Sequence, residues 1–155
     1  MSALLLLAVC AGTSIISSCG DDDENVVVAP NSGGNSGSAN GHEYVDLGLP
    51  SGTLWATCNV GASKPEEYGD YFAWGETKPK SDYSWETYKW CKGSSKTMTK
   101  YCTNSKYGYN GFTDDLWELL PEDDAATVNW GSGWQTPSLA QLKELFNSIT
   151  PRRSG

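Results

Sequence analysis

The chain has 155 residues and a formal net charge of −8, from 19 acidic and 11 basic side chains. This length fits one domain, and a negative chain without a basic stripe would repel phosphate backbones, which argues against a nucleic-acid partner. Seven Trp and eight Tyr are many for this length, and aromatic rings with a polar edge suit a core whose rim meets water or a ligand face.

The first predicted segment is a signal peptide over residues 1–18. Leu4 to Val9 and Ile15 to Ile16 supply its apolar part, which is too short and too interrupted for a transmembrane helix. Ile16 to Cys19 resembles a bacterial lipobox. The resemblance implies cleavage before Cys19 and attachment of a lipid such as palmitate to its sulfur; the alternative is an ordinary secretory signal with a chance cysteine.

An acidic run follows the cysteine and consists of Asp21, Asp22, Asp23 and Glu24. It resembles the surface-export signal of Bacteroidetes-type lipoproteins, although it would also fit a solvated acidic patch. We therefore expect a lipid-anchored protein of the outer membrane, displayed on the cell surface. Each buried acyl methylene contributes about 0.8 kcal/mol, so several chains on one cysteine would anchor firmly.

Residues 19–40 are predicted to be the lipid anchor and a flexible tether. After a short Val26–Val28 patch, the Gly, Ser and Asn residues that lead to Asn40 offer too little apolar surface to offset the entropy of ordering. A coil of this length spans roughly 25 Å.

The folded module is predicted over residues 41–155. Residues 44–49 and 53–60 fit a β-hairpin around a Pro-Gly turn, and residues 70–75 fit a third strand. Residues 76–111 are predicted to form long loops with short strands.

The clearest predicted element is a helix near residues 138–149. Ser138 and Gln141 form a capping box, and five apolar residues make one stripe. They are Leu139, Leu142, Leu145, Phe146 and Ile149.

Three separated blocks carry a family resemblance: Glu43 to Ala62, Tyr71 to Glu76 and Asp123 to Gly131. They resemble the Fibrobacter succinogenes major paralogous domain, which is similar to C-type-lectin-like and sulfatase-modifying-factor folds. The resemblance implies an α+β, lectin-like mixed fold on a bacterial surface protein, without an established activity.

The chain departs from that family in two ways. Gln135 stands where the family has an arginine, which removes a charge-assisted hydrogen bond. The family's domain also continues through further strands after this helix, so we expect a truncated module with unpaired strand edges and marginal stability or self-association.

Catalysis is not expected. His42 is the single histidine, so neither a His-based triad nor a multi-histidine metal site can form. The related sulfatase-modifying enzymes use cysteines after the Trp-rich motif, and none follows Trp134. Of the remaining cysteines, Cys91 and Cys102 are predicted to form a disulfide, whereas Cys58 is predicted to be a buried free thiol.

Two binding hypotheses remain. The acidic residues around Pro121, Asp123 and Asp124 among them, are weak calcium candidates, with a solvated loop and a capped turn as the alternative. Tryptophans could stack on sugar rings or fill the core; we assign Trp55, Trp74 and Trp130 to the core and Trp85 and Trp90 to ligand binding.

The sequence thus predicts a non-catalytic surface lipoprotein module that binds glycans or surface polymers. The alternative is a structural or assembly component of an adhesin or pilus-like structure, in contact with another surface protein.

Overall fold

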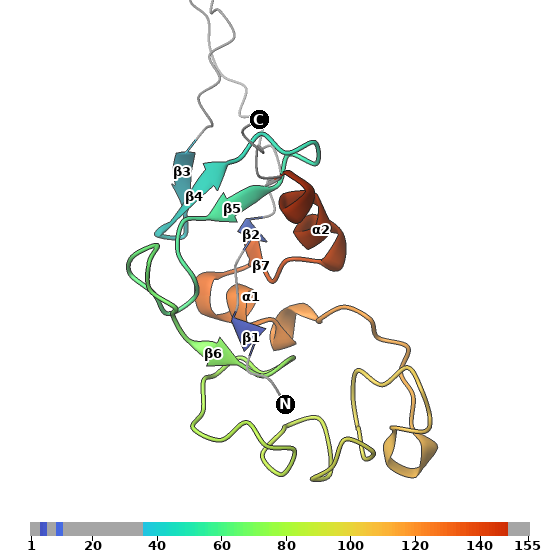
Figure 1. Cartoon of the computed structure of the whole chain (residues 1–155). Coiled ribbons are helices and arrows are strands. Elements are labelled where there is room, and N and C mark those ends of the chain that lie inside the picture. The colour runs from blue at the N-terminus through green and yellow to red at the C-terminus, as the bar shows by residue number, and fades with distance from the viewer. Residues whose placement is uncertain (1–3, 6–8, 11–35, 149–155) are drawn as a thin grey trace, which may run out of the picture.

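The computed structural model describes residues 4–5, 9–10 and 36–148 (Figure 1). Cys19 and the acidic run Asp21 to Glu24 lie outside the described residues. The strands are β1 (Leu4–Leu5), β2 (Val9–Cys10), β3 (Ser36–Ala39), β4 (His42–Asp46), β5 (Leu54–Ala56), β6 (Tyr71–Phe72) and β7 (Trp134–Gln135). The helices are the 3-10 turns η1 (Tyr109–Gly111) and η2 (Pro121–Asp123) and the α-helices α1 (Ala125–Trp130) and α2 (Leu139–Ser148).

The strands form a five-stranded sheet in the order β3-β4-β5-β2-β7 and a two-stranded sheet of β1 and β6. All neighbouring strands are antiparallel. At the level of fold class the prediction is confirmed: the module is α+β, with a small antiparallel sheet, two short helices and many loops. Among the described residues, no helix is long and apolar enough to cross a membrane.

The predicted hairpin after residue 44 is present as β4 and β5. Val45 lies opposite Trp55, and the Gly52 N–H donates to the Leu49 carbonyl at 2.9 Å to close the turn. Glu144 of α2 braces this turn, because its Oε1 accepts the Ser51 N–H at 2.9 Å.

The predicted tether over residues 19–40 is wrong at its C-terminal end, where a second hairpin is present. Residues 36–39, which we expected to be flexible, form β3 and pair with β4. Asn40 and Gly41 turn the chain with φ values of 52° and 82°, the left-handed pair that an Asn-Gly hairpin turn requires. Tyr44 lies over Gly37, where a Cβ would come within 2.5 Å of its hydroxyl, so the aromatic ring covers the glycine strand.

The predicted helix is confirmed as α2, including its capping box. The Ser138 N–H donates to Gln141 Oε1 at 2.8 Å, and the Gln141 N–H donates to Ser138 Oγ at 3.2 Å. Leu142 and Leu145 pack against Leu49 and Trp55. The predicted single apolar stripe is wrong at two positions, because Leu139 and Phe146 are 68% and 69% exposed; Ile149 lies outside the described residues.

The main core lies on the other side of the sheet, where α1 packs. Its buried members are Val60, Phe72, Ala125, Ala126, Trp130 and Trp134. Trp134 Nε1 donates to the Ala39 carbonyl at 3.0 Å and so joins β7 to β3. The third predicted strand is reduced to the dipeptide β6. The long loops predicted over residues 76–111 are confirmed, but the short strands expected within them are not formed; isolated bridges and the turn η1 stand in their place.

Two dipeptides of the predicted signal segment pair with the module. Leu4–Leu5 pairs with β6, and Val9–Cys10 lies between β5 and β7 (Figure 1).

Candidate functional site

A hollow of about 350 Å³ lies between the end of β6, the loop before η2 and the start of α2. Two tryptophans with exposed rings line it: Trp74 is 39% exposed and Trp117 is 77% exposed. The remaining wall includes Glu118, Gln135 and Leu139. The surface is therefore largely aromatic and apolar, with a carboxylate and an amide at hand.

Trp74 is held by hydrogen bonds to the backbone on which it sits. The Tyr88 hydroxyl donates to the Trp74 carbonyl at 2.8 Å, and Trp90 Nε1 donates to the Gly75 carbonyl at 2.7 Å. Gly75 has φ of 73°, and a Cβ there would come within 2.8 Å of Trp90 Nε1. Glycine is thus required next to Trp74, and the exposed indole stands on a constrained turn.

Trp117 also projects from a braced loop. Asp114 accepts the Leu116 N–H at 3.3 Å on one side, and the Tyr101 hydroxyl accepts the Leu120 N–H at 3.0 Å on the other. Asp114 additionally accepts the backbone N–H groups of Tyr101 and Cys102. An apolar ring held in water on a constrained loop loses little entropy when it binds a ligand.

The opposite wall is fixed through Asp124. Its carboxylate accepts the Thr136 N–H at 2.8 Å and the Thr136 hydroxyl at 3.0 Å, and it also caps α1 by accepting from Ala126 and Thr127. This places β7 and the start of α2 relative to α1, and with them Gln135 and Leu139.

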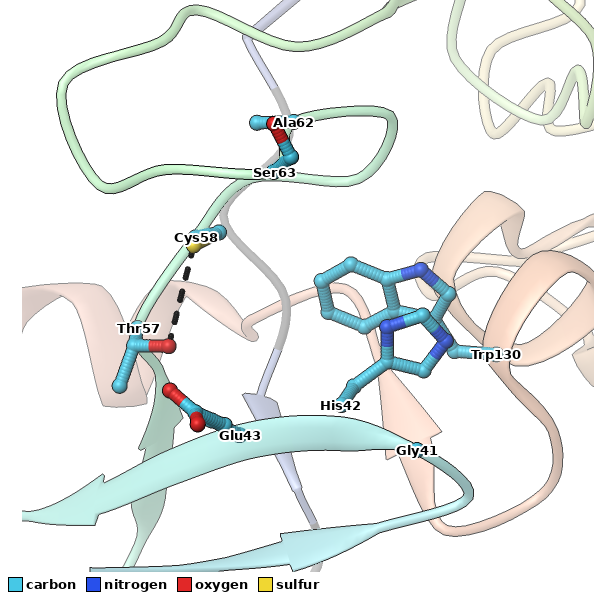
Figure 2. Close-up of a pocket in the computed structure, with 8 residues that line it drawn as sticks. All are labelled: Gly41, His42, Glu43, Thr57, Cys58, Ala62, Ser63 and Trp130. Carbon is cyan, nitrogen blue, oxygen red and sulfur yellow. Dashed lines mark hydrogen bonds between the residues drawn. The ribbon is translucent and has the colours of Figure 1, made fainter.

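A second hollow of about 300 Å³ lies beside the start of β4 (Figure 2). The His42 ring stacks on Trp130, with ring centroids 4.1 Å apart, and burial lowers the pKa of His42. Cys58 lies on the other side, and its sulfur is 3.8 Å from Thr57 Oγ1 (Figure 2). The stacked Trp130 ring thus covers one face of the histidine. Cys58 is half-buried and free, whereas we expected it to be buried.

The two tryptophans predicted to bind ligand lie outside the Trp74–Trp117 hollow. Trp85 packs edge-on against Tyr88. Lys89 and Lys100 place their ammonium groups over the Trp90 ring, 4.1 and 4.6 Å from its centroid. Trp74, which we assigned to the core, is exposed instead, and no local pattern in the sequence separates it from the buried Trp55 and Trp130.

The predicted Cys91–Cys102 disulfide is not formed in this structure. Both residues are free thiols, and they donate to different carbonyls. Cys91 Sγ is 3.0 Å from the Trp85 carbonyl, and Cys102 Sγ is 3.3 Å from the Asn104 carbonyl.

The two calcium candidates, Asp123 and Asp124, are engaged within the protein. Asp123 forms ion pairs with Lys100 and with Lys89, the latter at 3.4 Å, and accepts the Tyr101 hydroxyl at 2.8 Å. Asp124 caps α1, as the alternative interpretation of this loop anticipated. In the part of the chain that the structure describes, no group of three or more His, Cys, Asp or Glu side chains could hold a metal ion.

Comparisons of the chain with protein-family models, with curated proteins and with solved structures found no match. The functional interpretation therefore depends on the geometry of this chain.

Proposed function

We propose that the protein is a non-catalytic surface lipoprotein whose module binds a glycan or a surface polymer in the Trp74–Trp117 hollow. The observation that carries the proposal is the exposure of Trp117, an indole kept in water on a loop braced on both sides. A flat aromatic face matches the C–H face of a sugar ring. Glu118 and Gln135, in the same hollow, supply hydrogen-bond partners for hydroxyl groups.

The proposed location at the cell surface depends on the lipobox and the acidic run near the N-terminus. A lipidated Cys19 followed by the acidic run would place the module outside the cell, where glycans and surface polymers are present. The lectin-like resemblance and the mixed α+β fold agree with such a role. The single histidine is stacked on Trp130, which leaves no general base of that kind near the exposed indoles.

Replacing Trp117 with Ala tests the site. On a glycan array the wild-type protein is expected to bind at least one sugar class, and Trp117→Ala should weaken that binding at least tenfold, or about 1.4 kcal/mol, because a central aromatic anchor is lost. Calorimetric titration of the strongest sugar measures the change.

Tyr68→Ala is the matched control, because Tyr68 is an aromatic residue that is 71% exposed and lies outside the lining of the hollow. Equal losses for the two variants would contradict the site. Absence of binding across the whole array would favour the structural or assembly role instead.

Replacing Cys19 with Ala tests whether the protein is anchored to the membrane by a lipid. Without the thiol there is no acceptor for the acyl chains, so the protein is expected to move from the membrane fraction to the soluble fraction. Fractionation followed by immunoblotting measures this, with Cys58→Ala as the control because Cys58 lies within the folded module. Unchanged partitioning of Cys19→Ala would contradict lipidation.

A further inference from the structure

The centre of the five-stranded sheet is occupied by a segment from the far N-terminus. Val9 lies opposite Trp55 of β5 and Gln135 of β7, and Cys10 lies opposite Leu54 and Trp134. Strand β2 therefore pairs on both sides, and β5 and β7 contact it along facing edges (Figure 1). Because neighbouring strands lie about 4.8 Å apart, β5 and β7 are separated by about 9.6 Å, which leaves room for a single strand between them.

This central position is covered on both faces. Trp55 packs with Leu142 and Leu145 of α2. Trp134 belongs to the core cluster on the face where α1 packs, and it is 1% exposed. A strand enclosed in this way must be apolar on both faces, as a continuous rather than an alternating run.

Removal of the signal peptide would leave the position between β5 and β7 without a strand. Cleavage before Cys19 removes β2, and the backbone N–H and C=O groups along the inner edges of β5 and β7 then lose their partners. Unpaired buried backbone groups are strongly unfavourable, and an open pair of strand edges is a template for another chain.

We propose that the position between β5 and β7 is a strand-accepting site, which takes an extended and continuously apolar segment of a partner polypeptide once residues 1–18 are removed. The inference rests on the processing step of the proposed function. The segment pairs antiparallel to both β5 and β7, as β2 does, and main-chain hydrogen bonds supply much of the affinity. The chain's own apolar run from Leu4 to Val9 shows the composition that fits.

The test compares the processed lipoprotein, purified in mild detergent, with the full-length Cys19→Ala chain, which retains residues 1–18. The probe is a synthetic peptide of residues 4–11 with added terminal lysines. Saturating peptide is expected to raise the melting temperature of the processed protein by about 5 to 10 °C and to leave the unprocessed chain unchanged, since its own β2 fills the site.

The control is the same peptide with Val9→Pro, which lacks a backbone donor at the paired position and should give no shift. A dimer of the processed protein that the peptide dissociates would also support the proposal, because the open edges would then be pairing with each other. The strand-accepting site would be overturned if the processed protein is a monomer, melts at the same temperature as the unprocessed chain and shows no shift with the peptide. Mass spectrometry of the N-terminus reports separately whether cleavage before Cys19 occurs. Failure of the predicted processing is therefore distinguished from failure of the strand-accepting site.

Discussion

Asp123→Asn is expected to lower the free energy of unfolding by about 2 kcal/mol, because it removes the charge of a buried carboxylate that accepts hydrogen bonds from two partly exposed lysines and a tyrosine hydroxyl. Asp123 is 2% exposed and has Lys100, Lys89 and the Tyr101 hydroxyl as partners. Burial raises the pKa of Tyr101 to about 12, so this hydroxyl stays protonated and donates. Urea unfolding followed by tryptophan fluorescence measures the loss.

Glu122→Gln is the matched control, since it makes the same change of charge at the neighbouring, exposed position. It should change the free energy of unfolding by no more than about 0.5 kcal/mol. Similar losses for the two variants would show that net charge, and not the network, is responsible.

The ionisation of Asp123 also makes the free energy of unfolding depend on pH in the acid range. Burial acts to raise the pKa of Asp123, but hydrogen bonds from Lys100 and Tyr101 and the charges of Lys100 and Lys89 outweigh it, so the pKa lies below its usual value. A lowered pKa contributes stability that is complete above about pH 4 and is lost as the pH falls through the folded pKa. Between pH 5 and pH 2, Asp123→Asn should therefore lose less stability than the wild type.

Asp124→Ala is expected to cost about 3 kcal/mol, because one buried carboxylate serves two elements. It accepts the Ala126 and Thr127 N–H groups at the start of α1 and both the N–H and the hydroxyl of Thr136 after β7. Loss of the cap contributes about 1 kcal/mol, and unpaired backbone donors account for the rest.

The distinguishing measurement compares Asp124→Ala with Thr136→Val, which removes only the hydroxyl partner and should cost about 1 kcal/mol. Because Asp124 also sets the wall of the Trp74–Trp117 hollow, Asp124→Ala should weaken sugar binding under conditions where the variant remains folded. A fully stable Asp124→Ala variant would contradict the bracing role.

Elements specified by neighbouring residues were predictable. The α2 helix begins directly after Ser138 as expected, because the capping box of Ser138 and Gln141 is complete within four residues. The turn at Leu49–Gly52 was likewise predictable from its own proline and glycine. By contrast, β3 was missed because a Gly and Ser run has no hydrophobic period and becomes a strand only by pairing with β4. The Asn40–Gly41 turn was the signal that would have revealed it.

The candidate site was beyond sequence reasoning for a different reason. Trp74, Trp117 and Trp134 are the same residue type, yet they are 39%, 77% and 1% exposed, because exposure depends on which distant residues cover each ring. The spacing of Cys91 and Cys102 in the sequence similarly did not predict their contacts, because the fold places each thiol against a different backbone carbonyl. The sequence by itself determined the capped helix, the hairpin and the long loops, because short-range sterics and hydrogen bonds suffice for them. Only the tertiary structure decided which indoles meet water and which strand fills the centre of the sheet, because both depend on contacts between residues far apart in the chain.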